Sequence, residues 1–353
     1  MSELVAQLLL EAWDAAAATA AETQLQVLRG ALGVIVLFNP SHSQRKRPVD
    51  QQLLRGAAVS SASPPPTAFN FTQIKPNEVL CALTVDECGE LPPQVRVRAV
   101  DERPPRHAVL VNVSPLMRGH SLVVFDVAQL RPQRLELSYL RASVAVVHAA
   151  RDAHFALGFN SAGAWSSVNH LHLQCFFPSQ LDPGLQLPIL RQNRRELFRA
   201  AGGAPAAVFE FPHWPMRCYG VGVGAAERDS SGAAFNGVVR VAWALLQLLQ
   251  ARGIPHNVLV AHDDATSQPL VVVFPRREQQ ENGVALFSQH EHAGEGAEGL
   301  RFAVAEVAGL VVAGTATRFR HFSQEIYERI MRDEVSLPQD EAASIVDEWK
   351  RLL

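Results

Sequence analysis

The sequence predicts an α+β protein with a mostly antiparallel sheet and packed helices, arranged as two related halves. Of the 353 residues, 48% are hydrophobic and 19% are charged, which provides material for a large core and excludes a generally disordered chain. Pairs of predicted strands alternate with predicted helices in both halves, an order typical of α+β proteins. At about 150 residues per domain, the length predicts roughly two units.

The charge and the cysteine content exclude several classes of protein. A net charge of -3 argues against a nucleic-acid partner or binding to an anionic membrane surface. The four cysteines are too few for a disulfide scaffold, and none belongs to a C-x-x-C pair of the kind found in many zinc sites. The N-terminal segment is acidic and lacks a membrane-length apolar run, so we expect a cytoplasmic protein.

The first half is expected to contain an N-terminal helix and strands around a central helix. Leu4, Leu8, Leu9 and Trp13 fall on one face of the N-terminal helix, which packs on the domain. Residues 39–68 are polar, basic and rich in proline, which predicts an exposed loop. The other elements are a buried strand at 31–38, two strands with their turn at 108–125, a helix at 136–151, and a strand, glycine-rich turn and strand at 155–177.

The second half repeats this order less sharply. A polar linker at about 178–207 leads to a long amphipathic helix at 234–251, which stops at Gly253. Two strands, a charged glycine-rich loop and another helix follow at 257–261, 270–275, 280–299 and 301–313. The chain is thereby divided into an N-terminal helix, a first half, a second half and a C-terminal helix, at 1–30, 31–190, 191–335 and 336–353.

The most informative segment follows a turn rich in glycine, serine and asparagine. On a strand of period two, His170, His172 and Gln174 share one face, while Leu171 and Leu173 face the core. Such a turn can point backbone N–H groups at an anion, and a neighbouring imidazole can attack phosphorus. From these residues alone, catalysis, structural histidines and a metal site all remain open.

A second segment places His120 between two predicted strands, in the run Ser114-Pro115-x-x-x-Gly119-His120-Ser121-Leu122-Val123-Val124. Together with Ser167-x-Asn169-His170-x-His172-x-Gln174, it resembles the histidine-triad superfamily of nucleotidyl hydrolases and transferases. The hydrolase branch has histidine at the third position of the triad, whereas this chain has Gln174, like the transferase branch. The resemblance implies a histidine-triad-like fold whose catalytic histidines lie only in the first half.

Further segments narrow the resemblance to the GDP-hexose phosphorylases, the family of the GDP-D-glucose and GDP-L-galactose phosphorylases. These segments are 45–48, 69–80, 111–115, 130–135, 157–161, 254–260 and 306–309. The similarity extends from about 30 to 335 and is sharpest at 108–177. The residues at 74–80 and 167–173 favour D-glucose over L-galactose as the hexose.

The resemblance implies the reaction of GDP-hexose with phosphate to give hexose 1-phosphate and GDP. His172 would be the nucleophile that forms a covalent GMP–histidine intermediate, and His170 would orient His172 or the turn. Gln174 would donate a hydrogen bond to a phosphoryl oxygen, because an amide cannot shuttle protons as a third histidine would. No cofactor and no metal are implied, since the cysteine pair that would accompany a zinc-binding histidine is missing.

A set of nucleotide- and phosphate-binding residues follows from the same resemblance. They are Asn112 for a ribose hydroxyl, Asn160 and Ser167 for phosphate, and Lys75 and His120 for the nucleotide or its phosphates. Arg45 and Arg47 are further candidate phosphate contacts, and for these two arginines and for Lys75 a solvated surface is the alternative. Glu306 is expected on a solvated helix face rather than in contact with the nucleotide or sugar.

Functions of other classes stay open at this point. One is a diadenosine polyphosphate phosphorylase or nucleotidyl hydrolase, and the other is a catalytically silent nucleotide-binding protein. The intact His170, His172 and Gln174 argue against the silent protein, because folding does not require all three. The expected partners are GDP-hexose and inorganic phosphate, with neither nucleic acid nor membrane, and a homodimer is left open.

Overall fold

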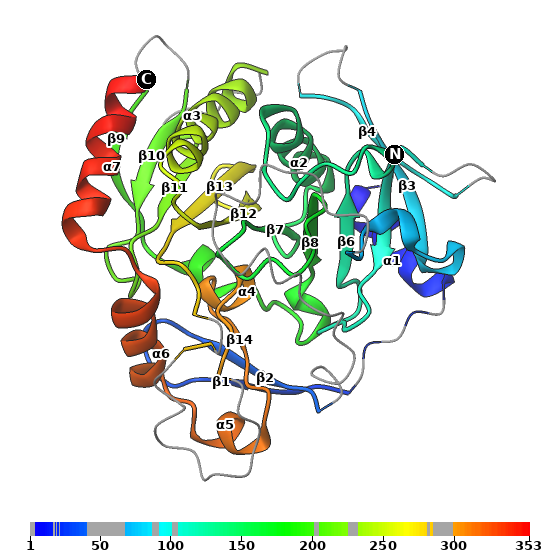
Figure 1. Ribbon diagram of the computed structural model, residues 1–353, viewed down its shortest axis with the longest axis horizontal. Helices are drawn as coiled ribbons and strands as arrows, with labels where there is room; N and C mark the ends of the chain where they lie inside the picture. Colours follow the sequence, from blue (N-terminus) through cyan, green and yellow to red (C-terminus); the bar gives the residue numbers. More distant parts are fainter. Residues whose placement is uncertain are drawn as a thin grey trace.

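The computed structural model describes residues 4–16, 18, 20, 22–40, 68–86, 92–100, 105–200, 205–224, 232–280, 283–284 and 299–353. Arg45, Arg47 and most of the predicted loops at 39–68 and 280–299 lie outside the described residues. Within the described ranges, a long sheet carries a row of helices on one face and a smaller sheet on the other side (Figure 1).

The described residues form an 11-stranded sheet in which every pair of neighbouring strands is antiparallel. In order across the sheet, the strands are β4 (Val95–Arg98), β3 (Val79–Val85), β5 (His107–Val111), β6 (Ser121–Val124), β8 (His172–Phe176), β7 (Ala156–Asn160), β12 (His256–Asp263), β13 (Gln268–Pro275), β11 (Tyr219–Gly222), β10 (Ala207–Glu210) and β9 (Arg195–Arg199). The predicted α+β fold with a mostly antiparallel sheet is confirmed.

Four helices lie in a row along one face of this sheet (Figure 1). They are α1 (Val5–Ala15), α2 (Leu137–Ala150), α3 (Gly232–Ala251) and α7 (Gln339–Leu352). Helix α3 is long and apolar enough to cross a membrane by length and composition, and 61% of its apolar window is buried inside the protein. This burial identifies α3 as a core helix, because it packs against α2, β11 and β13.

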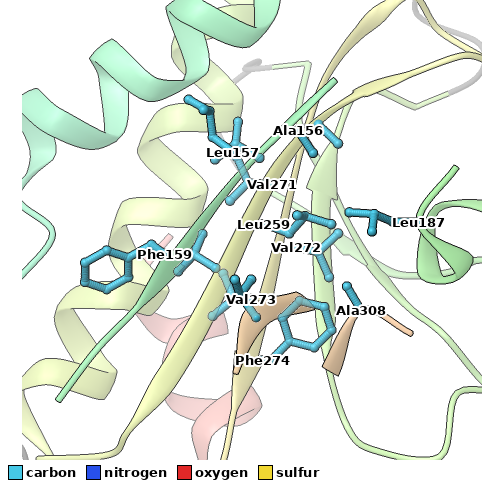
Figure 2. Packing of buried hydrophobic residues seen from close by; sticks show 14 of the residues in the cluster. Ala156, Leu157, Phe159, Leu187, Leu259, Val271, Val272, Val273, Phe274 and Ala308 are labelled. Atoms are coloured by element: carbon cyan, nitrogen blue, oxygen red, sulfur yellow. The ribbon is translucent and has the colours of Figure 1, made fainter. Parts of the chain in front are cut away.

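The centre of the sheet is buried on both faces (Figure 2). Leu157 and Phe159 of β7 point to one side, whereas Ala156 points to the other, as the period of two requires. On the side of Ala156, the side chains of Leu259 and Val272 meet Leu187 and Ala308. Burial on both faces explains why β7, β12 and β13 read as continuous apolar runs in the sequence.

The face opposite the helix row carries a short helix and a small sheet. Helix α4 (Val304–Val307) contacts β7 and β12, and it leads into β14 (Leu310–Val312). Strand β14 pairs in parallel with β2 (Ile35–Phe38), which pairs antiparallel with β1 (Gln24–Val27). The remaining helical elements are η3 (Phe71–Gln73), η4 (Pro76–Glu78), η5 (Val127–Gln129), η6 (Pro178–Gln180), η7 (Pro188–Arg191), α5 (Ala316–His321), α6 (Gln324–Ile330) and a π-helical turn at Met331–Val335.

Two element predictions are wrong. The segment 178–207, predicted as a polar linker, contains β9, whose charged residues are exposed because it is the edge strand. The segment 301–313, predicted as a helix, contains only the one-turn α4 and then β14. Gly309, with φ +98°, breaks the helix between them, and a Cβ there would come within 2.6 Å of Pro188. Both elements are buried, so the apolar run at 301–313 has no periodicity that distinguishes a helix from a strand.

Candidate active site

A cavity opens on the sheet face that carries α4. Its walls come from four neighbouring strands, the turn after β7, the η3–η4 segment and the α4 region. The lining residues used below are Phe71, Glu78, Asn112, His120, Asn160, Trp165, Ser167, His172, Gln174, Arg301, Ala303 and Glu306. Among the predicted site residues that the structure describes, all but His170 and Lys75 therefore meet in one place.

The strand register explains how these side chains come to share a face. Gln174 of β8 lies opposite Leu122 of β6 and opposite Gly158 of β7, and directly opposed residues of antiparallel strands point to the same side. His172 and Asn160, two residues along their strands, point to that side as well. Strand β8 begins only at His172, so His170 lies in the preceding turn instead of on the strand face.

The imidazole of His172 has a fixed orientation. Its Nδ1 lies 2.8 Å from the backbone carbonyl oxygen of His170, which can only accept a hydrogen bond. In the neutral ring, Nδ1 therefore carries the proton, and Nε2 keeps its lone pair. The side chain of Gln133 secures the backbone here, because it accepts from His172 N at 2.9 Å and donates to the carbonyl oxygens of His172 and Asn160 at 3.1 and 3.0 Å.

The amide of Gln174 is oriented by His120. The backbone N–H of Leu116 donates to Nδ1 of His120 at 2.8 Å, so the proton of the neutral ring lies on Nε2. That Nε2 donates to Oε1 of Gln174 at 3.1 Å, which turns the NH2 group of Gln174 away from His120. Burial lowers the pKa of His120 to about 4, which keeps the ring neutral near pH 7. Asn112 lies beside this pair, with Nδ2 3.2 Å from His120 Nε2.

His170 anchors the wall of the cavity with its ring and orients His172 with its backbone. The side chain is fully buried, and its Nδ1 accepts a hydrogen bond from the backbone N–H of Phe71 at 3.1 Å. The Phe71 ring packs against both imidazoles, with centroids 5.3 Å from His170 and 5.2 Å from His172. Burial, together with the neighbouring His172, lowers the pKa of His170 to about 4.

The predicted binding residues divide into two groups. Asn112, Asn160 and Ser167 line the cavity. Lys75 is exposed and does not line the cavity, and its backbone N–H donates to the Glu78 carboxylate at 2.8 Å as part of a capping arrangement. The Glu78 side chain lines the cavity, so the acidic residue of this segment approaches the site while the basic one faces solvent.

The α4 region supplies a charged wall that sequence reasoning missed or misplaced. Glu306 is 7% exposed and lines the cavity, so the expectation of a solvated helix face is wrong. The cause is that α4 is a single turn enclosed between the two sheets. The guanidinium of Arg301 lies 5.3 Å over the ring of Trp165, whose φ of +68° is unusual for a bulky residue. No sequence motif marked Arg301 or Trp165.

The thiols and metal-ligating side chains give no sign of a metal centre in the part of the chain that the structure describes. No group of three or more histidine, cysteine, aspartate or glutamate side chains is arranged there to hold a metal ion. Cys81, Cys175 and Cys218 are buried free thiols, and burial raises the pKa of Cys81 and Cys175 to about 12. These two thiols are therefore protonated near neutral pH.

Solved structures share this architecture. The crystal structure of yeast Ap4A phosphorylase Apa2 superposes with a TM-score of 0.58 at 13% identity, covering 96% of this chain and 97% of that chain. Its complex with AMP matches with a TM-score of 0.57 at 14% identity, covering 96% of this chain and 99% of that chain. At this identity the likeness concerns the fold, which is the histidine-triad-like architecture expected from the sequence.

Sequence comparisons identify the family. Residues 5–176 match the model described as GDPGP1-like, N-terminal domain, and residues 188–351 match GDPGP1-like, C-terminal domain. The chain belongs to this GDPGP1-like family, and the resemblance to GDP-hexose phosphorylases is confirmed.

Curated relatives carry the names of GDP-hexose phosphorylases. Human GDP-D-glucose phosphorylase 1 is 35% identical over 181 residues, which cover 48% of this chain and 43% of that protein. GDP-L-galactose phosphorylase 1 of Arabidopsis thaliana is 26% identical over 243 residues, covering 69% of this chain and 50% of that protein. The matched part of this chain thus spans half or less of the length of these relatives.

Proposed function

We propose that this chain is a GDP-hexose phosphorylase that transfers a guanylyl group from GDP-hexose to inorganic phosphate, releasing hexose 1-phosphate and GDP. One observation carries the proposal: His172 lines the cavity with Nδ1 bound to a carbonyl oxygen, which leaves the Nε2 lone pair as its nucleophile. Family membership and the curated relatives support the choice of substrates.

The first half-reaction forms a phosphoramidate on His172. Nε2 attacks the α-phosphorus of GDP-hexose, and the bond from that phosphorus to the oxygen bridging to the β-phosphate breaks. The electron pair of this bond leaves with hexose 1-phosphate, while GMP stays on Nε2. Because Nδ1 keeps its proton, the ring gains positive charge during the attack, and the His170 carbonyl oxygen at 2.8 Å stabilises that charge.

The second half-reaction regenerates the enzyme. An oxygen of inorganic phosphate attacks the α-phosphorus, the phosphorus–Nε2 bond breaks, and its electron pair returns to His172. The product is GDP, and no other reactant is needed.

Gln174 suits this chemistry because the leaving group needs no proton. The second pKa of a phosphate monoester is about 6, so hexose 1-phosphate leaves as a stable anion near pH 7. A donor that stabilises charge on the phosphoryl oxygens is then sufficient, and the NH2 group of Gln174, turned away from His120, is such a donor. Since an amide cannot activate water as an imidazole can, the covalent intermediate is preserved for phosphate.

The hexose proposed is D-glucose. Six curated relatives named GDP-D-glucose phosphorylase 1 match at 27–38% identity, five of them at 31% or more, whereas the two plant GDP-L-galactose phosphorylases match at 26%. The names of these relatives also support guanine as the base. No motif in this chain reads a base edge by itself, so the choice of guanine depends on these relatives. The mechanism proposed is the same for either hexose.

A substrate panel tests the proposal. Phosphate-dependent formation of the nucleoside diphosphate is measured with GDP-D-glucose, GDP-L-galactose, GDP-D-mannose, UDP-glucose, ADP-glucose and diadenosine tetraphosphate. We expect GDP-D-glucose to react fastest and to label the protein with GMP when phosphate is omitted. Equal turnover of ADP-glucose would refute guanine specificity, and preferred turnover of diadenosine tetraphosphate would favour the second class of phosphorylase. A preference for GDP-L-galactose would change the hexose only.

A further inference from the structure

A buried cation of the C-terminal half lies outside the set of residues that line the cavity. Arg276 follows β13 and is 2% exposed. Its Nη1 donates to Oδ1 of Asn257 at 3.2 Å and to the carbonyl oxygen of Phe302, and its Nε donates to the carbonyl oxygen of Arg277 at 3.2 Å. Burial lowers the pKa of Arg276 to about 10, so the guanidinium remains charged near neutral pH.

The cation fixes the orientation of the next side chain. An arginine can only donate, so Asn257 must present its oxygen to Arg276 and its NH2 group to the opposite side. That NH2 group donates to the carbonyl oxygen of Ala164 at 2.9 Å and to Oδ1 of Asn160 at 2.7 Å. Asn257 is fully buried, and the strand register sets it directly opposite Asn160.

Asn160 is fixed in turn by two donors. Its Oδ1 accepts from Asn257 and also from the backbone N–H of Val304, at 2.9 Å, at the start of α4. Both donors hold the Oδ1 atom of Asn160. The atom of this side chain that can act in the cavity is therefore Nδ2, which is a donor. We call this hydrogen-bonded chain of Arg276, Asn257 and Asn160 the relay. It begins at a guanidinium that can only donate, and it ends at the NH2 group of Asn160.

We propose that Asn257 and Arg276 are positioning residues that hold the amide NH2 of Asn160 toward the phosphoryl group bound at His172. This inference rests on the proposed function and extends it, because it assigns part of the site to the C-terminal half. Asn160 and Gln174 then supply two NH2 donors to one phosphoryl group from neighbouring strands. Each amide is oriented by a neighbour whose own hydrogen-bond role is fixed.

The burial of charge in this relay favours a functional reason over a packing reason. A buried arginine and two buried amides are costly to desolvate, and apolar side chains of similar size would fill the same space at lower cost. The relay supplies what apolar packing cannot, namely a single orientation for the Asn160 amide.

A double-mutant cycle tests the relay. The single-turnover rate of GMP–enzyme formation is measured for Asn160→Ala, for Asn257→Ala and for the double variant. We expect Asn257→Ala to slow formation about tenfold to a hundredfold, as loss of alignment does. We expect the double variant to be no slower than Asn160→Ala alone, because Asn257 acts through Asn160. Multiplying effects, or a wild-type rate for Asn257→Ala, would overturn the relay.

A second variant keeps the test decisive if Asn257→Ala does not fold. Asn257→Asp has the same size and still accepts from Arg276, but it presents an oxygen instead of an NH2 group to Asn160. We expect the same slowing, and a wild-type rate would contradict the proposal. The matched control is Tyr219→Phe, which removes a buried hydrogen bond of 3.4 Å to Ala342 in the same half, away from the cavity. Tyr219→Phe should not alter the rate of GMP–enzyme formation. If Tyr219→Phe coupled to Asn160→Ala as strongly as Asn257→Ala does, that result would also overturn the relay.

The double-mutant cycle of Asn160→Ala and Asn257→Ala is repeated with a second measured quantity, the affinity for GMP determined by calorimetry. This readout separates the two proposals: a wild-type protein that forms no adduct from any GDP-hexose would refute the proposed function. The GMP affinities would still decide the relay. Non-additive weakening by Asn160→Ala and Asn257→Ala supports it, and additive or absent weakening rejects it.

Discussion

Gly158 of β7 lies directly against Val304 of α4, so that a Cβ at position 158 would come within 2.6 Å of Val304 Cγ1. The same Cβ would meet Phe176 at 2.8 Å. The missing side chain therefore lets α4 approach the sheet closely enough for the Val304 N–H to reach Asn160. A glycine within a central strand here marks a close approach between elements.

Replacing this glycine tests the close approach. We expect Gly158→Ala to lower the free energy of unfolding by about 1–3 kcal/mol through overpacking, and to slow GMP–enzyme formation because α4 is displaced. Urea unfolding measures the first effect. Adding Val304→Ala should recover part of both losses, because it removes the nearest clashing atoms. A Gly158→Ala protein with wild-type stability would contradict the geometry.

The nucleophile can be removed without removing the fold. His172→Asn should abolish turnover and the labelled GMP adduct, because an amide forms no phosphoramidate. The thermal midpoint should stay close to that of the wild type, since the side chain borders a cavity instead of filling the core. Intact-mass measurement after incubation with GDP-hexose is the readout. A GMP adduct on this variant would assign the nucleophile to another residue.

Gln174 should influence rate and product ratio separately. Gln174→Ala removes one phosphoryl donor, which typically costs about 3–4 kcal/mol of transition-state stabilisation, and some adduct should remain detectable. Gln174→His should raise the ratio of GMP to GDP at saturating phosphate, because an imidazole activates water. His120→Ala is the matched control, since it frees the Gln174 amide to rotate and should slow the reaction without raising that ratio. An unchanged ratio in Gln174→His would refute the argument.

The positive charge of the α4 wall should act on phosphate-bearing ligands. Among the described residues that line the cavity, Arg301 is the one arginine, and none is a lysine. Arg301→Ala should therefore raise the KM for phosphate or GDP-hexose by at least tenfold, with a smaller effect on kcat. Arg301→Lys should recover part of the loss. An unchanged KM for both substrates would show that Arg301 contacts neither.

The buried histidines predict a specific acid sensitivity. Burial lowers the pKa values of His120, His170 and His256 to about 4, against about 6.5 in the unfolded chain. As the pH falls below about 6.5, the unfolded chain binds protons first. Each histidine then removes stability by up to about 1.4 kcal/mol per pH unit until about pH 4. His256→Asn should lose about 2 kcal/mol less than the wild type between pH 7 and pH 5. Equal losses in urea unfolding would show that His256 is not protected.

The sequence predicted the strand face of the site well and its distant walls poorly. The period of two at 170–174 was sufficient to set His172 and Gln174 on one face, because local alternation determines it. The same pattern placed His170 on this face as well, which is wrong, because the strand begins only at His172. Arg301 and Glu306 could not be placed, because they reach the cavity through pairing and packing between segments far apart in the chain. The relay through Asn257 depends on the β7–β12 register, which no local pattern encodes.

The β7–β12 pairing also has a consequence for dissecting this protein. The two strands join both halves into one hydrogen-bonded sheet through five opposed residue pairs. A fragment ending before β12 would leave β7 with bare N–H and C=O groups, an open edge that invites aggregation with other chains. Such a fragment would retain His172 and lose the partner of Asn160. Separate expression of the two halves is therefore expected to yield insoluble protein, whereas co-expression gives each open edge its natural partner.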